Sequence, residues 1–340
     1  MKSVLVTGGA GFIGSHTVVE LAAAGYKPVV VDDFSNSEKF VIERLEKLLG
    51  TKVAHYDFDY KDIGRLKQIV EKENVTGIIH FAAFKSVSES LERPLDYYSN
   101  NVGGLINLLA FCEGSPVENF VFSSSCTVYG EPDDLPVTED SPLKPATSPY
   151  GATKQMGETI TADAARVSQS FNALSLRYFN PIGAHESALI GELPKGVPAN
   201  LVPFVTQTAA GIHDHVTVYG DDYSTPDGTC IRDYIHVVDL AKAHVKALAY
   251  VEKKPVAFYD FINVGTGKGS SVLEVIKTFE QVSGQKLPYE VGPRRAGDLV
   301  STYASVVKAS KELGWKAEKT LADGLADAWR WQQSLGKQMR

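Results

Sequence analysis

The stretch V-L-V-T-G-G-A-G-F-I-G-S-H at residues 4–16 joins a short apolar run to a glycine-rich loop and then to a helical pattern. Gly8, Gly11 and Gly14 have the G-x-x-G-x-x-G spacing that is typical of dinucleotide-binding loops. We expect Gly8 to permit the tight turn, Gly11 to let the backbone approach a pyrophosphate, and Gly14 to allow close packing of helix on strand. A glycine triplet also occurs in ordinary strand–helix turns, so the surrounding sequence has to decide.

The first half of the chain alternates short apolar runs with helical patterns. Continuous apolar runs are typical of strands covered on both faces, and repeated strand–helix units imply a parallel sheet. We expect strands around residues 4–7, 29–32, 52–57, 77–83, 119–125 and 172–180, and helices around residues 12–25, 37–49 and 61–74 and from Tyr150 onward.

After residue 180 the sequence becomes rich in Gly, Pro and polar residues, although residues 232–251 again have the pattern of a strand and a helix. The chain therefore predicts an α/β fold, with a Rossmann-type doubly wound parallel sheet in a domain of residues 1–180. A segment near residues 230–265 is expected to return to this sheet. Residues 181–340 are predicted to form a smaller mixed α/β C-terminal substrate domain, which is partly discontinuous.

A carboxylate at the end of the second expected strand supports a nucleotide cofactor. Asp32 lies roughly twenty residues after the glycine loop, where such a group binds the adenosine ribose hydroxyls and repels the 2′-phosphate of NADP. We therefore expect NAD. Asp57 ends the third strand, where it could contact adenine or serve as a turn residue.

Tyr150 and Lys154 have the spacing Y-x-x-x-K, which puts both side chains on one helix face. Ser125 follows another expected strand at the carboxyl edge of the sheet. A tyrosine that removes a proton from a sugar hydroxyl must titrate below its usual value near ~10, and an adjacent ammonium and a positive nicotinamide both favour the phenolate. Ser125 would hydrogen-bond the same oxygen. Without the glycine loop, the pair would indicate only an exposed helix pair.

Composition excludes other classes of protein. The 340 residues carry a net charge of -7, which argues against a nucleic-acid partner. The apolar runs are shorter than the ~20 residues of a membrane span. The three cysteines are odd in number, far apart and without C-x-x-C spacing, so they indicate neither a disulfide framework nor a thiolate metal site. We expect a cytoplasmic protein with no membrane partner and no metal, and a solvated loop at His213 and His215.

The motifs resemble the extended short-chain dehydrogenase/reductase family, and within it the UDP-glucose 4-epimerases. The resemblance runs from end to end through VLVTGGAGFIGSH, HFAAFKSVSES, NNVGGLINLL, FSSSCTVYG, SPYGATK, LRYFNPIGAH, DGTCIRDYIHVVDLA, NVGTG and GPRRAGDL. It implies a homodimer that interconverts UDP-glucose and UDP-galactose at C4 through a 4-keto intermediate, using tightly bound NAD. The implied catalytic residues are Ser125, Tyr150 and Lys154.

The loop and the resemblance together give the expected ligand contacts. The cofactor contacts are Gly8, Gly11, Phe12, Ile13, Gly14, Asp32, Asp57, Phe81, Lys85, Asn100, Tyr150, Lys154 and Tyr178. The UDP-hexose contacts are Lys85, Ser125, Tyr150, Asn180, Asn200, Tyr219, Arg232, Arg295, Asp298 and Thr302. The guanidinium group of arginine can donate two parallel hydrogen bonds to a pyrophosphate, so arginine suits this ligand better than lysine.

Thr302 lies four residues after Asp298, where a tyrosine in the family confines the pocket to glucose and galactose. The smaller threonine resembles enzymes that also accept UDP-GlcNAc and UDP-GalNAc, unless it merely packs a loop. A 4,6-dehydratase would need an acidic pair after Ser125, where Cys126 and Thr127 stand. Another NAD-dependent nucleotide-sugar enzyme, such as a UDP-glucuronate 4-epimerase, and a noncatalytic NAD-sensing protein of the same fold stay open as alternatives.

Overall fold

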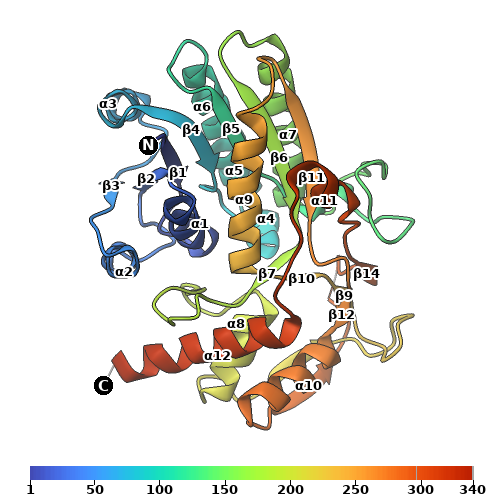
Figure 1. Cartoon of the computed structure of the whole chain (residues 1–340). Helices are drawn as coiled ribbons and strands as arrows, with labels where there is room; N and C mark the ends of the chain where they lie inside the picture. The colour runs from blue at the N-terminus through green and yellow to red at the C-terminus, as the bar shows by residue number, and fades with distance from the viewer. Residues whose placement is uncertain (296, 339–340) are drawn as a thin grey trace.

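The computed structural model describes residues 1–295 and 297–338, and its largest sheet has seven parallel strands in the order β11-β6-β5-β4-β1-β2-β3 (Figure 1). The strands are β1 (Ser3–Thr7), β2 (Lys27–Asp32), β3 (Ala54–Asp57), β4 (Val75–His80), β5 (Asn119–Ser123), β6 (Asn172–Tyr178) and β11 (Tyr259–Val264). The chain first adds strands on one side of β1 and then on the other, so the winding direction changes between β1 and β4. Ligands of such sheets bind at the carboxyl ends of the strands beside this point. The predicted fold class is confirmed.

Helices cover both faces of the large sheet. One face carries α1 (Phe12–Ala23), α2 (Phe40–Leu49) and α9 (Val237–Val251), and the other carries α3 (Ile63–Glu73), α6 (Gly104–Cys112) and α7 (Pro149–Val167). In β1, Val4 and Val6 join the first apolar core while Leu5 joins the second, and all three are buried. Burial on both faces explains why the strand sequences read as continuous apolar runs.

Local signals set the ends of several helices. Asp62 accepts a hydrogen bond from the backbone N–H of Arg65 at 3.1 Å and caps α3. Gly25 follows α1 with a φ of +84°. The second helix begins at Phe40 and not at Ser37, where the sequence predicts it. The Ser37 hydroxyl donates to Asp32 at 2.8 Å.

The C-terminal part is built from short strands and three helices at one end of the large sheet (Figure 1). Its strand pairs are β7 (Asn180–Ile182) with β10 (Tyr234–His236), β8 (Val216–Tyr219) with β13 (Tyr289–Gly292), and β9 (Ile231–Arg232) with both β12 (Ser270–Ser271) and β14 (Ser301–Thr302). The helices α8 (Leu201–Ala209), α10 (Val272–Ser283) and α12 (Leu321–Gln338) share a separate apolar core with these strands. Ser271 and Glu274 form a capping box at the start of α10.

The chain returns to the large sheet between its two parts. Helix α9 packs on the first face, β11 extends the sheet beside β6, and α11 (Val307–Leu313) packs against both. The strand at the start of residues 232–251 pairs with β7 in a small sheet, whereas the helix that follows it packs on the large sheet. Strands of both sheets are apolar, which is why the sequence pattern could not separate them. Among the described helices, none is long and apolar enough to cross a membrane.

Candidate active site

The glycine-rich loop connects β1 to α1 at the carboxyl edge of the sheet. Gly8 has a φ of +69°, and a Cβ there would lie 2.9 Å from the backbone nitrogen of Ala82. A Cβ on Gly14 would collide with the carbonyl oxygen of Gly8, and one on Gly11 would lie 3.2 Å from the same oxygen. None of the described side chains caps the start of α1. Its first backbone N–H groups, which include those of Phe12 and Ile13, are therefore suited to bind an anion.

Asp32 lies beside this loop at the end of β2 and is 8% exposed. One carboxylate oxygen accepts the backbone N–H of Ala10 at 2.9 Å, and the other accepts the N–H of Phe34 at 2.9 Å and the hydroxyl of Ser37 at 2.8 Å. Burial raises the pKa of Asp32, whereas these hydrogen bonds lower it. The carboxylate is therefore held in a fixed place next to the loop, where a ribose hydroxyl could donate to it.

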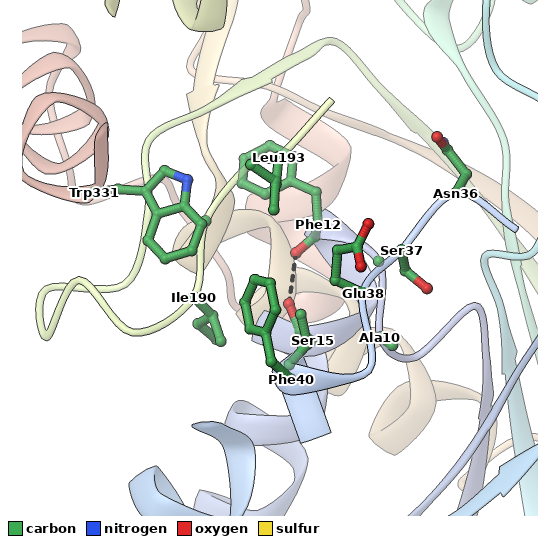
Figure 2. Close-up of a pocket in the computed structure, with 13 residues that line it drawn as sticks. Ala10, Phe12, Ser15, Asn36, Ser37, Glu38, Phe40, Ile190, Leu193 and Trp331 are labelled. Carbon is green, nitrogen blue, oxygen red and sulfur yellow. Dashed lines mark hydrogen bonds between the residues drawn. The ribbon is translucent and has the colours of Figure 1, made fainter. Parts of the chain in front are cut away.

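A hollow beside the loop is walled by the start of α1, residues 36–41, residues 190–193 and the indole of Trp331 (Figure 2). The Trp331 ring lies against Gly191, where a Cβ would approach it to 2.6 Å, and its N–H donates to the carbonyl of Glu192 at 2.8 Å. The C-terminal helix thus supports one wall of the cofactor side. Sequence analysis did not single out Asn36, Ser37 or Trp331, although Ser37 follows Asp32 closely enough to have been a candidate.

Ser125, Tyr150 and Lys154 come together at the carboxyl ends of β5 and β6. Tyr150 and Lys154 lie in the first turns of α7 and are both buried. The Lys154 ammonium donates to the carbonyl of Ser123 at 2.7 Å and lies 5.8 Å from the centre of the Tyr150 ring. Ser125 caps the 3₁₀ turn Cys126–Tyr129, and its side chain is close enough to the phenol of Tyr150 to lower the pKa of that group. The geometry brings together the three residues predicted from separate motifs.

Burial dominates the acid–base properties of this group. It raises the pKa of Tyr150, an effect that nearby Tyr178 increases and the Ser125 hydrogen bond reduces. Burial also lowers the pKa of Lys154 to about 8, against the opposing charge of Glu158. The expected effect of the ammonium therefore does not by itself overcome the desolvation of the phenol. A phenolate at Tyr150 requires a further positive charge next to the ring.

The three consecutive serines at the end of β5 have different partners. The Ser123 hydroxyl bonds the hydroxyl of Tyr178 at 2.7 Å, and the Ser124 hydroxyl donates to Glu158 at 2.5 Å. The Ser125 hydroxyl accepts the backbone N–H of Thr127 at 3.2 Å. This short segment therefore connects β6, α7 and the 3₁₀ turn.

The other cofactor candidates lie in different surroundings. The rings of Phe81 and Tyr178 lie 4.6 Å and 6.0 Å from the ring of His244, which packs under this side of the sheet. Asn100 accepts the ammonium of Lys61 at 2.8 Å. Asp57 lies on the surface at the end of β3 and pairs with Lys39 at 2.5 Å, so its contact with adenine stays a prediction.

Asp59 lies near one of the predicted cofactor contacts. Its carboxylate pairs with Lys61 at 3.2 Å, and that lysine reaches Asn100, so Asp59 is linked to a predicted cofactor contact.

Four substrate candidates gather on the C-terminal part. Asp298 accepts Arg295 at 2.8 Å and Arg232 at 3.4 Å, and the Arg295 guanidinium lies 5.7 Å from the centre of the Tyr219 ring. The side chain of Arg232 is 15% exposed and that of Arg295 is 57% exposed. The neighbouring Arg294 pairs instead with the exposed Asp222 at 2.7 Å. Two guanidinium groups thus converge where a diphosphate could replace or join the carboxylate.

Glu192 connects two further candidates. One of its carboxylate oxygens accepts Asn200 at 2.8 Å and Lys85 at 3.3 Å. Asn180 opens β7, and its backbone N–H donates to the carbonyl of Asp233 at 2.9 Å. The role of Glu192 carried no sequence signal, because its partners lie far away along the chain.

Thr302 is buried in β14, directly opposite Arg232 in the register with β9. Tyr303 is partly exposed, and its ring is close to Gly269. Since side chains alternate along a strand, the two residues face opposite sides.

His213 stacks on Phe204 with 4.4 Å between ring centres, and His215 pairs with Glu290 at 3.6 Å. Within residues 1–295 and 297–338, no group of three or more His, Cys, Asp or Glu side chains is arranged to hold a metal ion.

Comparison with known proteins places this geometry in a family. A family model described as GDP-mannose 4,6 dehydratase matches residues 5–328. The UDP-glucose 4-epimerase of Dictyostelium discoideum is 49% identical over 329 residues, covering 97% of this chain and 95% of that protein.

Two solved structures are similar over nearly their full length. The UDP-glucose 4-epimerase from Stenotrophomonas maltophila with bound NAD and formylated UDP-arabinopyranose has a TM-score of 0.96 and 45% identity, covering 99% of this chain and 100% of that one. The UDP-glucose 4-epimerase from Bifidobacterium longum in complex with NAD+ and UDP has a TM-score of 0.93 and 47% identity, with 98% of each chain covered. The chain therefore belongs to the extended short-chain dehydrogenase/reductase family, in the group of the UDP-glucose 4-epimerases.

Proposed function

We propose that this protein catalyses the reversible C4 epimerisation of UDP-glucose and UDP-galactose through a 4-keto intermediate, with tightly bound NAD. The convergence of Ser125, Tyr150 and Lys154 at the same edge of the sheet as the glycine loop is the observation that carries the proposal. The paired arginines at positions 232 and 295 supply a second, cationic group for the diphosphate of the substrate. The similarity to epimerase structures that hold NAD and a UDP compound supports the same conclusion.

The residues of the loop fit NAD. Gly8 and Gly14 leave the space that a side chain would fill, the uncapped start of α1 suits the pyrophosphate, and Asp32 suits an unphosphorylated ribose. When bound, NAD supplies a hydride acceptor that returns the hydride, so the reaction has no net redox change. We assign the adenosine end to Asp32 and the nicotinamide end to the Tyr150 side of the sheet edge.

The protein's own groups handle the proton and hold the substrate. Tyr150 takes the proton of the C4 hydroxyl and later gives it back to the C4 oxygen, while Ser125 hydrogen-bonds the reacting oxygen and Lys154 adds positive charge. Arg232 and Arg295 hold the diphosphate, so the hexose needs few contacts of its own and can turn between the two half-reactions. Binding energy on the nucleotide thus retains the intermediate.

The first test is incubation of the purified protein with UDP-galactose and no added NAD, followed by NMR analysis of the products. We expect UDP-glucose to form and no reduced product to accumulate. A parallel incubation with UDP-glucuronate tests the nearest alternative enzyme. Activity that depends on added NADPH, or turnover of UDP-glucuronate alone, would contradict the proposal.

Dehydration is the less suitable chemistry, although the matching family model is described as a dehydratase. Elimination of water needs an acid and a base beside the reacting hydroxyl. Cys126 and Thr127 occupy those places, and burial raises the pKa of the Cys126 thiol to about 11. The same NMR experiment would detect a 4-keto-6-deoxy sugar if elimination took place.

The proposed role of Tyr150 as acid and base predicts a large loss of activity when its hydroxyl is removed. Tyr150→Phe keeps the ring but removes the acid–base oxygen, so kcat should fall by about 10²–10⁴-fold. Binding of UDP, measured by calorimetry, should stay within about twofold, since the diphosphate contacts are unchanged. Turnover close to that of the original protein would assign the proton transfer to another group.

Thr302 supports an extension of the substrate range to UDP-GlcNAc and UDP-GalNAc. Its small side chain faces the buried side of β14 opposite Arg232, while the larger Tyr303 faces away. We expect Thr302→Tyr to lower kcat/KM for UDP-GalNAc by at least about tenfold more than for UDP-galactose. Equal losses for both substrates, or no turnover of UDP-GalNAc by the unmodified protein, would remove this extension.

A homodimer is the assembly we propose. Ile106 on α6 and Met156 on α7 are 47% and 45% exposed, so neighbouring helices present apolar side chains that a second copy could cover. Sedimentation velocity at micromolar concentration should give about twice the monomer mass. A single monomeric species would contradict the dimer.

We also propose a cytoplasmic location. Cys112, Cys126 and Cys230 are free thiols, which suits a reducing compartment. Fractionation of cells that express the protein with an epitope tag tests this location.

A further inference from the structure

Glu158 occupies the same face of α7 as the two candidate catalytic residues. It follows Lys154 by four residues and Tyr150 by eight, and it is 5% exposed. A carboxylate that is buried this deeply costs free energy unless its charge and its lone pairs are satisfied. The proposed function leaves this residue without a role.

The contacts of Glu158 come from two strands of the large sheet. Arg177 on β6 donates to the carboxylate through Nε at 2.8 Å and Nη2 at 2.6 Å, and Ser124 after β5 donates through its hydroxyl at 2.5 Å. Arg177 also donates to the hydroxyl of Tyr129 at 3.0 Å and is buried as well. The carboxylate therefore fastens α7 to the edge of the sheet that carries the candidate active site.

The Ser124 bond links Glu158 to the catalytic group. Ser124 lies between Ser123, whose carbonyl accepts the Lys154 ammonium, and Ser125, whose hydroxyl reaches Tyr150. A shift of this segment would move both contacts at once. The hydrogen bond from Ser124 therefore links Glu158 to the two neighbouring serines that contact Lys154 and Tyr150.

The charges around Lys154 identify a second effect of Glu158. The titratable groups placed against this ammonium are Tyr150 and Glu158 on α7 and His80 at the end of β4. On β6, Tyr178 acts on Tyr150, and Arg177 pairs with Glu158. Burial lowers the pKa of His80 to about 3 and raises the pKa of both tyrosines, so these three are neutral near pH 7. Among the described residues, Glu158 is the carboxylate that opposes the effect of burial on the pKa of Lys154.

We propose that Glu158 is a positioning residue of the epimerase reaction, which keeps the Lys154 ammonium charged and fixes the 123–125 segment through Ser124. This inference rests on the proposed function for its kinetic consequences. Its electrostatic part concerns the protein alone and does not depend on the substrate.

The kinetic test compares Glu158→Gln with the unmodified holoenzyme. We expect kcat for UDP-galactose to fall by about 10–100-fold while KM changes by less than about threefold, because the diphosphate contacts are untouched. The basic limb of the kcat–pH profile should move to lower pH by about one unit or more, since Lys154 loses its proton earlier without the carboxylate. Asp163→Asn removes an exposed carboxylate of the same helix, and this control should leave the profile unchanged.

A second variant guards against simple misfolding. Glu158→Gln leaves Arg177 buried without its partner, whereas Glu158→Gln combined with Arg177→Met removes the whole ion pair and replaces it with groups of similar volume. We expect this double variant to fold, as judged by circular dichroism and thermal unfolding, and to keep the shifted basic limb. A double variant with the original profile and rate would overturn the proposal and leave Glu158 a purely structural role.

NMR titration of ε-¹³C-labelled lysine separates this inference from the function itself. In the holoenzyme the Lys154 resonance, assigned with Lys154→Met, should titrate about one unit lower in Glu158→Gln than in the unmodified protein. This result stands even if UDP-galactose is not a substrate. Identical titration curves would overturn the electrostatic role whether or not the enzyme turns over UDP-galactose.

Discussion

The cofactor side and the substrate side of the candidate site are built by different means. The cofactor side depends on backbone shape and buried groups, as at Gly14, Asp32 and Lys154. The substrate side depends on ion pairs between partly exposed side chains, as at Arg295 and Asp298. The regular elements of the large sheet hold the first side, whereas two-residue strands and loops hold the second.

This difference matches what the proposed reaction asks of each side. Hydride transfer in both directions requires the cofactor and Tyr150 to keep one geometry, which packed strands and helices provide. The hexose has to turn between the two half-reactions, so its surroundings must leave room while the diphosphate stays in place. Adjustable ion pairs at the anchor and small side chains such as Thr302 suit that task.

We expect the largest loss of activity from a substitution in the glycine-rich loop, where the backbone leaves no room for a side chain. Gly14→Ala would drive a methyl group into the carbonyl of Gly8, so the strand and α1 would have to separate. Overpacking of this kind costs about 1–3 kcal/mol, and the displaced loop would no longer present its N–H groups to the pyrophosphate. We expect the purified variant to lose bound NAD, measured by absorbance after denaturation, and to lose at least about 100-fold of its activity.

Gly103→Ala is the matched control for that variant. It is also a helical glycine, but a Cβ there meets no atom within 4 Å. Alanine favours helix over glycine by up to about 1 kcal/mol, so this variant should keep its NAD and melt at the same or a higher temperature. Retention of NAD by Gly14→Ala would show that the cofactor side adapts more than its packing suggests.

Sequence patterns predicted the parts of the site that a single element fixes. The glycine loop, Asp32 and the Tyr150–Lys154 pair each follow from spacing along one strand, turn or helix, and the structure brings them to the same edge. The α/β sheet with its switch of winding direction was predictable for the same reason.

Contacts between distant segments could not be predicted. The Glu192 carboxylate accepts hydrogen bonds from Lys85 and Asn200. The indole of Trp331, near the end of the chain, donates to the backbone carbonyl of Glu192. No periodicity encodes such pairs, because they depend on how separate loops pack. The C-terminal strands are too short for their partners to be read from the sequence, as for β10, which pairs with β7.

A moderate effect is expected on the substrate side, and it should differ between the two arginines. Arg232→Lys removes a mostly buried guanidinium group, which can donate two parallel hydrogen bonds. KM for UDP-galactose should therefore rise by about 10–100-fold with little change in kcat. Arg295 is mostly exposed and screened by solvent, so Arg295→Lys should raise KM by less than about fivefold. Steady-state kinetics at low and high salt measures both. A larger effect at Arg295 than at Arg232 would reverse the order of importance that their burial implies.

At neutral pH the smallest effect is expected at a buried histidine, whose contribution to stability changes only as the pH falls. It tests whether water is excluded from the cofactor side. Burial lowers the pKa of His244 to about 4, so the folded protein keeps this ring neutral at pH values where the unfolded chain, with a pKa near ~6.5, takes up a proton. Stability is therefore lost as the pH falls from about 6.5 towards 4, by about 1.4 kcal/mol per pH unit for this one group. His16 and His80, whose pKa values burial lowers to about 3, act in the same direction.

His244→Phe isolates this contribution, because it keeps a ring between Phe81 and Tyr178 but cannot titrate. Urea unfolding at pH 7.5 measures the cost of the packing change alone, including the lost bond from the ring to the carbonyl of Leu240. Between pH 6.5 and 4.5 the variant should then lose stability less steeply than the unmodified protein, by about 1.4 kcal/mol per pH unit. Parallel slopes would mean that water or a proton reaches His244 in the folded state, and the cofactor side would then share the openness of the substrate side.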